Sequence, residues 1–228
     1  AKNQVAKNKN DKLHFYNWWS VEFSTLWFYQ LVETLNLQKG NDKTIAFWSV
    51  YGSPNLVKWC SKDINIFYTG ENIHWNMYTD YTNYMLLDDR FGLNLGFDFF
   101  ESPRYLRFPL WITYAFKDCF TYEQVCKRCQ ELRYPKFNNR KKFASLIASW
   151  DPTGYRQEIG DLLTSISAID YAGKWRHNDD SLMNDYNDDK ISYLSQYYFN
   201  ICPENSNSYG YVTEKCWEAI MAGCIPIY

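Results

Sequence analysis

The residues with the clearest chemical potential lie near the end of the chain, in the segment YFNICPENSNSYGYVTEKCWEAIMAGCIPIY at 198–228. The pattern predicts a strand at 198–202, a polar loop, and a helix at 213–222. In open α/β sheets, ligands bind where loops leave the carboxyl ends of strands. A helix that begins there presents free N–H groups to an anion. The segment is therefore a candidate site for a nucleotide or another phosphate.

Two interpretations of this segment differ in the role that they give to Lys215. A cation in the first helical turn is disfavoured by the positive end of the helix dipole, and a bound phosphate would remove that conflict. Glu214 could then accept hydrogen bonds from ribose hydroxyls, and Gly210 would let the backbone approach a ligand closely. In the structural alternative, Thr213 caps the helix, Glu214 favours its dipole and Lys215 lies on the surface. The pattern alone leaves both open.

Two of the seven cysteines, Cys126 and Cys129, form a C-x-x-C pair. A structural zinc site needs further ligands, and no second pair has this spacing. We therefore expect no metal here, and two thiols on one face of a helix at 122–133. The odd cysteine count, in a chain long enough to form a core, favours reduced thiols and an intracellular protein.

Strands alternate with helices along the chain, which is typical of α/β domains with parallel sheets. The predicted strands are 12–18, 44–50, 64–68, 84–87, 143–149, 168–172, 198–202 and 225–228. The predicted helices are 21–37 with Ser20 as a candidate N-cap, a short one at 55–60, 122–133, 154–166, 191–196 and 213–222. In the apolar segment 106–114, Pro109 favours an edge strand or a break.

A basic, polar segment at 135–142, PKFNNRKK, separates two halves of this alternation. We interpret it as a solvated linker in preference to an anion site. The expected domains are therefore residues 1–138 and 139–228. The adjacent pairs Asp179-Asp180 and Asp188-Asp189 lie in a polar loop predicted at 174–190, and we interpret them as solvated surface. The sequence has no D-x-D metal motif between the two halves.

Composition limits the partners. The 228 residues carry a net charge of −2, which argues against nucleic acid as a partner because no basic excess neutralises its phosphates. Aromatic residues make up 20% of the chain, and such rings suit stacking on sugars, although we expect most of them in the core. No apolar run is long enough to cross a bilayer, and the first dozen residues lack the apolar stretch of a signal peptide. We expect a cytoplasmic protein, soluble as given. An anchor outside these residues, in the Golgi or another membrane, and peripheral membrane association both remain compatible with this expectation.

Several motifs together resemble the α-1,3-fucosyltransferases of glycosyltransferase family 10. Segment 198–228 follows that family's order of an F-N-x-C strand, an E-N-S loop, G-Y-V-T-E-K, a helix and I-P-I-Y. Further motifs are NWW at 17–19, FYTGEN at 67–72, RYLRFPL at 104–110 and KFASLIAS at 142–149. The match covers most of residues 65–228, and the first sixty residues only weakly.

The resemblance implies a GT-B-like α/β fold with two Rossmann-like domains facing a cleft. The N-terminal domain would bind the acceptor and the C-terminal domain GDP-fucose. The implied reaction is inverting transfer of fucose to a hydroxyl of an acceptor glycan, N-acetyllactosamine-like, without cofactor or metal. Geometry and charge stabilisation would do most of the work.

The resemblance also assigns residue roles. Glu71, which follows Gly70 at a strand end, is the expected catalytic base, with Glu101 as the next candidate. Arg156 and Lys215 would offset the charge of the departing GDP. Glu204 is expected to be a structural hydrogen-bonding residue. The full set of expected donor-site residues is Arg156, Asn205, Tyr211, Glu214 and Lys215.

The chain stops inside the family's pattern, so we expect an incomplete C-terminal domain with an exposed sheet edge. Two alternatives follow from this. One is a non-catalytic remnant that binds a nucleotide or a glycan. The other is a transferase of the same architecture that uses another nucleotide sugar.

Overall fold

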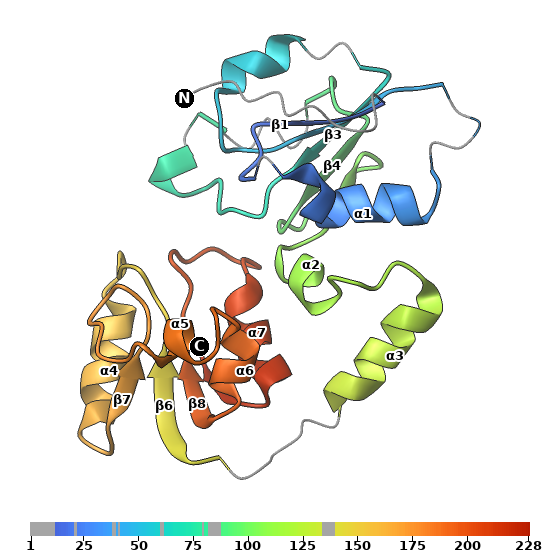
Figure 1. Cartoon of the computed structure of the whole chain (residues 1–228). Coiled ribbons are helices and arrows are strands. Elements are labelled where there is room, and N and C mark those ends of the chain that lie inside the picture. Colours follow the sequence, from blue (N-terminus) through green and yellow to red (C-terminus); the bar gives the residue numbers. More distant parts are fainter. Residues whose placement is uncertain are drawn as a thin grey trace. The chain divides into compact units, whose positions relative to one another are not determined.

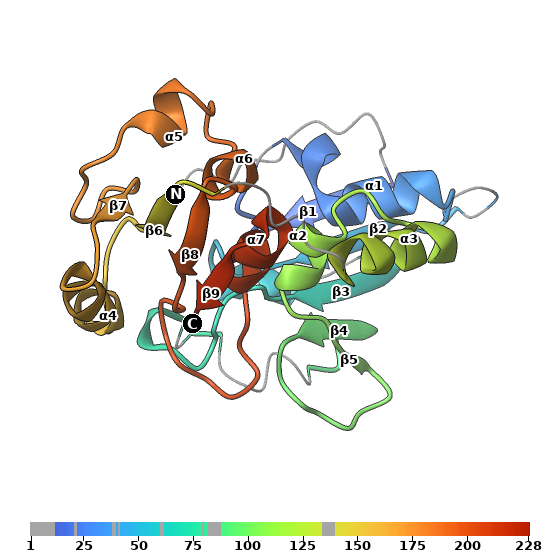
Figure 2. The ribbon, with the colours of Figure 1, turned by 90° about the horizontal axis from the view of Figure 1, so that it is seen from below.

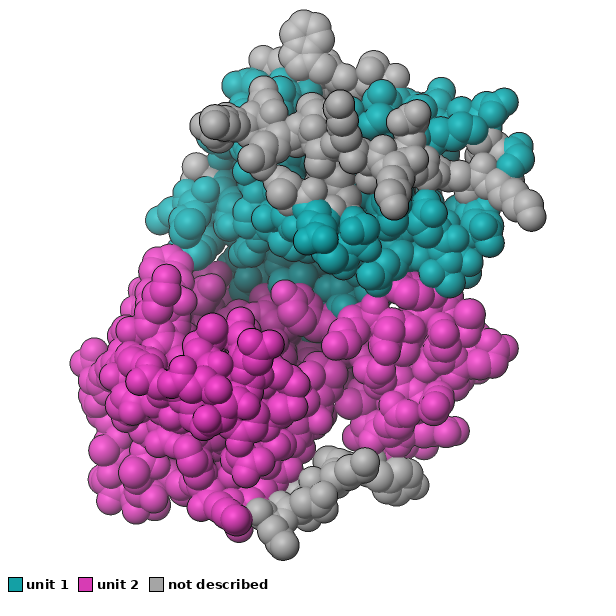
Figure 3. All heavy atoms as spheres, viewed as in Figure 1, with its two compact units in different colours: residues 1–113, 208–211 teal, residues 114–207, 212–228 magenta. Residues whose placement is uncertain are grey.

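The computed structural model describes residues 12–20, 22–37, 40, 42–59, 62–78, 80–81, 88–133 and 140–228. They form two compact units, which Figure 3 shows in different colours. Unit 1 comprises residues 1–113 and 208–211, and unit 2 comprises residues 114–207 and 212–228. The boundary between the two compact units thus falls between residues 113 and 114, whereas the predicted domain boundary lies between residues 138 and 139.

Unit 1 is built on a parallel sheet whose described strands follow the chain order β1-β2-β3-β4-β5, of which Figure 1 labels β1, β3 and β4. Its register pairs Leu13 with Ile45 and Ile45 with Ile64, so the carboxyl ends of the first three strands share one edge. The strands are β1 (Leu13–Tyr16), β2 (Ile45–Trp48), β3 (Ile64–Tyr68), β4 (Leu93–Gly96) and β5 (Tyr105–Arg107).

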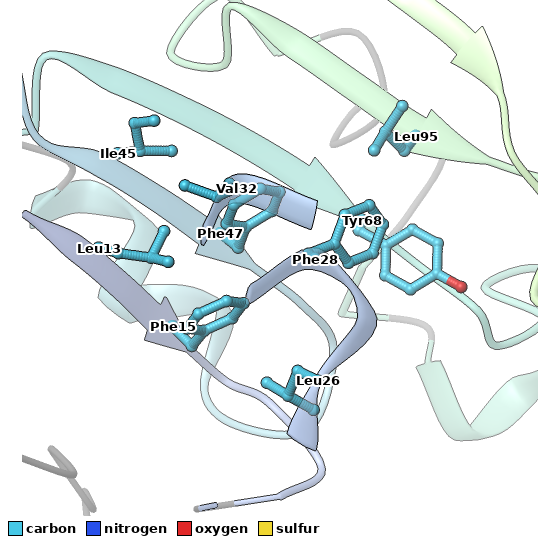
Figure 4. Close-up of a cluster of buried hydrophobic side chains, with 9 residues drawn as sticks. All are labelled: Leu13, Phe15, Leu26, Phe28, Val32, Ile45, Phe47, Tyr68 and Leu95. Atoms are coloured by element: carbon cyan, nitrogen blue, oxygen red, sulfur yellow. The ribbon is translucent and has the colours of Figure 1, made fainter. Parts of the chain in front are cut away.

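Helix α1 (Trp27–Thr34) covers one face of this sheet. It buries Phe28 and Val32 against strand residues such as Phe15 and Phe47, whose ring centroids are 5.2 Å apart (Figure 4). Burying each such side chain stabilises the fold by about 1.5–3 kcal/mol. The other face of the sheet carries a second cluster of buried residues, most of them aromatic.

The short 3-10 helices of this unit are η1 (Phe23–Thr25), η2 (Pro54–Trp59) and η3 (Asn76–Tyr78).

Unit 2 has a second parallel sheet with the order β7-β6-β8-β9, and Figure 2 shows β6 and β8 side by side between the two outer strands. Helix α4 packs on one face, whereas α5, α6 and α7 pack on the other. The strands are β6 (Lys142–Leu146), β7 (Ile169–Tyr171), β8 (Tyr197–Ile201) and β9 (Ile225–Ile227). The helices are α4 (Tyr155–Thr164), α5 (Ser181–Asn184), α6 (Lys190–Leu194) and α7 (Glu214–Ala222); α2 (Trp111–Ala115) and α3 (Tyr122–Arg133) precede them.

The predicted alternation is confirmed for most elements. Helix α5 lies within the loop predicted at 174–190, and α2 lies largely within the segment 106–114, for which no helix was predicted. Two further differences concern unit 1. The strand predicted at 84–87 lies outside the described residues, and β4, which was not predicted, follows β3 in the sheet. The helix predicted from residue 21 begins only at Trp27. Before it, Ser20 Oγ accepts a hydrogen bond from the Glu22 N–H, and Thr25 Oγ1 donates one to the Glu22 carbonyl. These local bonds favour a 3-10 turn over the first helical turn.

The predicted solvated linker is wrong at Arg140. Its side chain is buried in unit 2, where the guanidinium donates to the backbone carbonyls of Ser195 at 3.0 Å, Tyr197 at 2.8 Å and Ala222 at 3.0 Å. Ser195 and Ala222 stand at the ends of α6 and α7, where a cation satisfies carbonyls that lack helical partners. Residues 135–139 of the segment lie outside the described residues.

The C-x-x-C pair lies in α3, as predicted, with Cys126 partly exposed and Cys129 exposed. Protein purified without chelators should contain well below one equivalent of zinc by atomic emission, because the pair alone supplies too few ligands. The double variant Cys126→Ala, Cys129→Ala serves as the control and should have the same metal content. Stoichiometric zinc that disappears in the double variant would contradict the prediction.

Candidate functional site

A cavity of about 690 Å³ lies in unit 2, at the carboxyl ends of β6, β7 and β8. The chain runs from β6 to β7 on one side and then to β8 on the other, so the strand order reverses at β6. Such a reversal opens the crevice in which α/β sheets bind ligands. The lining comes from the loops after the three strands, including residues 147–150, 172–174 and Asn205, and from the start of α7. A cavity of this volume is large enough for a nucleotide sugar.

Gly173 lets two of these loops meet. A Cβ on Gly173 would lie 2.1 Å from the carbonyl oxygen of Ala148, so a larger residue would force the loops after β6 and β7 apart. Both residues line the cavity. The close approach therefore helps to form the cavity wall.

Arg156, in the first turn of α4, is held in place from several directions. Its side chain is buried, and its Nη2 donates to the Pro203 carbonyl at 3.0 Å and to Asn205 Oδ1 at 2.8 Å. Its Nη1 donates to the carbonyl of Trp150. Burial lowers the pKa of Arg156, but a guanidinium remains charged. Arg156 and Asn205 are thus fixed as one hydrogen-bonded pair in the cavity wall.

Lys215 stands at the start of α7 between two carboxylates. Its Nζ is 3.1 Å from Glu204 Oε2 and 3.2 Å from Glu214 Oε1, and it donates to Thr213 Oγ1 at 2.9 Å. Burial opposes the charged form of Lys215, but the two carboxylates outweigh it and raise the pKa. Burial of Glu214 would raise its pKa, but the neighbouring Lys215 cation outweighs this effect, so the pKa of Glu214 is lowered. The surface alternative for Lys215 is therefore wrong: a charged lysine is held in the cavity wall.

Glu204 fixes the start of α7. Its Oε1 accepts hydrogen bonds from the Thr213 N–H at 2.7 Å and from the Tyr228 hydroxyl at 3.1 Å, and the residue is buried. Thr213 occupies the N-cap position, but its side chain makes no capping bond and instead contacts Glu204. A carboxylate suits the positive end of a helix dipole. Glu204 thus has the structural hydrogen-bonding geometry expected of it.

The whole lining favours an anion. Four cationic side chains face the cavity against only two carboxylates. Arg156 and Lys215 were expected here, whereas Lys174 and Lys190 were not, because a polar loop pattern does not distinguish them from surface lysines. The six charged lining residues are Arg156, Lys174, Lys190, Lys215, Asp188 and Glu214.

Glu218 lies one turn after Glu214 on α7 and forms an ion pair with Lys190, which lines the cavity. The Glu218 Oε2 and Lys190 Nζ atoms are 3.7 Å apart. Burial raises the pKa of Glu218 to about 7, so this carboxyl titrates near neutrality. Its charge, and hence its hold on the cavity-lining lysine, therefore changes within the physiological range.

Tyr211 is not among the residues that line the cavity as described. It belongs to unit 1, where its ring packs against Phe97 with centroids 5.0 Å apart. Gly210 has a φ of +82°, and a Cβ there would lie 2.6 Å from the ring of Phe99. The close backbone approach expected at Gly210 therefore serves packing within unit 1. Arg107 fixes the same turn by donating to the Gly210 carbonyl at 3.2 Å.

Glu71 follows β3 at the carboxyl edge of the first sheet. Thr69 holds the turn, since its Oγ1 accepts from the Glu71 N–H at 3.1 Å and donates to the Glu71 carbonyl at 2.8 Å. The Tyr51 hydroxyl donates to Glu71 Oε1. Partial burial and the nearby carboxylate raise the pKa of Tyr51, although 43% of the residue stays exposed, and they raise the pKa of Tyr78 to about 12. Both phenols therefore stay protonated beside the carboxylate.

The structure thus groups the predicted residues in two sets. Arg156, Asn205, Glu214 and Lys215 line one cavity of unit 2. Glu71 and Tyr211 belong to unit 1.

The interpretation of the two Asp pairs as solvated surface is wrong for Asp179. Its side chain accepts from the Ser181 N–H and from the Tyr193 hydroxyl, each at 2.9 Å. Burial opposes the charged form, but these hydrogen bonds and Lys142 lower the pKa of Asp179 to about 2. Asp180, Asp188 and Asp189 are exposed.

Metal-ligand clusters and membrane-spanning helices are both absent from the described ranges. Within them, no three His, Cys, Asp or Glu side chains gather as a metal ion would require. No helix there has the length and apolar character needed to cross a bilayer.

Comparison with known proteins gives two family matches. Residues 13–114 match the α-(1,3)-fucosyltransferase FucT N-terminal domain, and residues 137–228 match the glycosyltransferase family 10 (fucosyltransferase) C-terminal domain. An α-(1,3)-fucosyltransferase FucT of Helicobacter pylori is 29% identical over 253 residues, which cover 95% of this chain. The chain spans about half the length of that relative, since the match covers 50% of it.

Solved structures agree in fold. A crystal structure of an α1,3-fucosyltransferase superposes with a TM-score of 0.61 at 26% identity, covering 95% of this chain and 67% of the other. A crystal structure of an α1,3-fucosyltransferase with GDP-fucose gives 0.59 at 27% identity with the same coverage. The predicted GT-B-like α/β fold class is thereby confirmed.

Proposed function

We propose that this chain, which belongs to glycosyltransferase family 10, transfers fucose from GDP-fucose to a hydroxyl of an acceptor glycan, with inversion, as an α-1,3-fucosyltransferase. One observation carries the proposal. The 690 Å³ cavity brings together Arg156, Asn205, Glu214 and Lys215, which lie up to 59 positions apart in the sequence, with an excess of positive charge.

The donor would bind through its diphosphate and its ribose. Arg156 and Lys215 offer fixed cations to the diphosphate, and such charge-assisted hydrogen bonds are each worth about 1.5–3 kcal/mol. Glu214 offers carboxylate oxygens to the ribose hydroxyls. When the bond between fucose and GDP breaks, its electron pair stays with the phosphate. The same cations then stabilise the added charge on the leaving group.

The acceptor step would use Glu71. The acceptor hydroxyl attacks the anomeric carbon on the face opposite GDP, and Glu71 takes the hydroxyl proton. Tyr51 donates to one carboxylate oxygen, Oε1, so the other oxygen is the one that would accept the proton. We propose an N-acetyllactosamine-like acceptor, and a reaction without metal or cofactor.

A second nucleotide sugar remains as the alternative donor, because the same cations would hold any nucleoside diphosphate. A non-catalytic nucleotide-binding remnant is the other alternative. It would keep the cavity but would not need the fixed contact between Tyr51 and Glu71. Activity with GDP-fucose and an acceptor separates the three.

GDP should stabilise the protein against heat. A ligand at 100 times its Kd adds about 2.7 kcal/mol to the free energy of unfolding, which raises the Tm of a chain of this size by roughly 5–10 °C. Differential scanning calorimetry with and without GDP measures this shift, with UDP as the control nucleotide. An unchanged Tm at millimolar GDP would contradict the donor-site assignment.

A further inference from the structure

Three loops leave the carboxyl edge of the unit 1 sheet next to one another, after β1, β2 and β3. They carry Trp19, Tyr51 and Glu71 respectively. We propose that Trp19 and Tyr51 form a stacking platform for a pyranose ring of the acceptor glycan, and that Tyr51 also positions Glu71. This inference rests on the proposed function and deepens it by naming an acceptor subsite.

The two rings are exposed although both are large. Trp19 is 45% exposed and Tyr51 is 43% exposed. Their centroids lie 5.8 Å apart with the planes at 70°, and Trp18 stacks on Trp19 at 4.8 Å. The platform therefore consists of Trp19, whose ring is stacked on Trp18, and of Tyr51, whose hydroxyl donates a hydrogen bond to Glu71.

Asn17 fixes the platform in advance of any ligand. Its φ is +54°, a left-handed conformation that asparagine adopts more readily than most residues. Its carbonyl accepts from the Tyr51 N–H at 2.9 Å, and its Nδ2 donates to the Ser53 carbonyl at 3.0 Å and to the Tyr81 hydroxyl at 2.9 Å. The turn that carries Trp18 and Trp19 is thus bonded directly to the loop that carries Tyr51. Such preorganisation lowers the entropic cost of binding.

The chemistry of the platform fits a sugar ring. A pyranose presents C–H groups on its faces and hydroxyls at its rim, so an aromatic ring can cover a face while a carboxylate binds the rim. Trp and Tyr supply apolar area with little loss of conformational entropy. Since Tyr51 joins the platform to Glu71, a ring seated there would bring a rim hydroxyl towards the proposed base.

Three variants separate stacking from positioning. Trp19→Ala should raise the KM for N-acetyllactosamine roughly tenfold, which corresponds to the loss of an aromatic contact of about 1.4 kcal/mol. The kcat should change little, because a contact that is equally strong in the ground state and the transition state affects binding alone. Trp19→Phe, which keeps an aromatic face, should restore most of the affinity. Tyr51→Phe keeps the ring but removes the donor to Glu71, so it should lower kcat with little change in KM.

The matched control is Tyr122→Ala, which removes an aromatic ring of unit 2 that is 80% exposed on α3. It should change neither KM nor kcat. Stability of each variant is compared by thermal unfolding, so that a folding defect is recognised.

A binding measurement tests the platform without turnover. In protein labelled with 5-fluorotryptophan, the Trp19 resonance, assigned from Trp19→Phe, should shift when N-acetyllactosamine is added in the presence of GDP. The platform is wrong if this resonance stays fixed while the glycan binds, or if Trp19→Ala leaves the acceptor KM unchanged. Failure of the proposed function would look different, because the parent chain itself would then transfer no fucose from GDP-fucose to the glycan.

Discussion

Replacing Glu71 by glutamine should lower fucosyl transfer by roughly 10²–10⁴-fold, the range expected for a positioned general base. Glutamine keeps the size of the side chain and can still accept the Tyr51 hydrogen bond, but it cannot take the acceptor proton. GDP affinity should stay close to that of the parent, because the donor cavity is lined by residues of unit 2 alone. Initial rates and a GDP titration measure the two effects.

Glu101→Gln is the control for this variant. Glu101 is exposed in unit 1 and is the next candidate for the base, so the pair of variants decides between them. Near-parent turnover in Glu71→Gln together with loss of turnover in Glu101→Gln would move the base to Glu101. A structural role for Glu71 would instead show as a lower Tm.

Lys215→Ala should weaken GDP binding by roughly 10- to 100-fold. The variant removes a charge-assisted bond to the diphosphate, worth about 1.5–3 kcal/mol. It also leaves the carboxylates of Glu204 and Glu214 facing the ligand without their shared cation. Calorimetric titration with GDP measures the loss of affinity.

The same variant should also lower stability, because removing one partner of a buried ion pair costs about 3–5 kcal/mol. Titrations are therefore made at a temperature where circular dichroism shows a folded protein. Lys142→Ala is the control, since Lys142 pairs with Asp170 on the same sheet but outside the cavity lining. Equal GDP affinity in the parent and in folded Lys215→Ala would exclude Lys215 from the donor site.

Glu214 and Lys215 could be predicted from the strand, loop and helix pattern of segment 198–228, whereas Arg156 and Asn205 were assigned to the donor site by the family resemblance. All four lie near the end of a strand or the start of a helix. Parallel strands bring such positions to one edge of a sheet. Lys174 and Lys190 could not be singled out in this way. Their loop has no regular period, and only the fold decides which of its lysines face the cavity.

Other errors arose where tertiary contacts override local pattern. Arg140 lies in a basic, polar segment that is typical of a solvated linker, yet it is buried because helix ends nearby leave carbonyls to be satisfied. Asp179 is held by hydrogen bonds from residues outside its own short loop, such as Tyr193. Tyr211 is a different case: it lies within the G-Y-V-T-E-K motif and belongs to unit 1, and its role at the donor site stays a prediction.

The platform residues show a third case. The NWW motif was visible as part of a family resemblance, but its physical meaning required the structure. Asn17 is bonded to the loop that carries Tyr51, 34 positions later in the chain, and these contacts help to place Trp19 beside Tyr51. Neither composition nor periodicity carries that information.

Calorimetric titration of this chain with GDP-fucose, GDP-mannose and UDP-galactose tests the central claim most directly. We expect one GDP-fucose site per chain, with weaker binding of GDP-mannose and of UDP-galactose at the same concentrations. Arg156→Ala, if folded, should remove most of the GDP-fucose signal. Absence of GDP-fucose binding, or equal binding of all three nucleotide sugars, would contradict a donor site built for GDP-fucose.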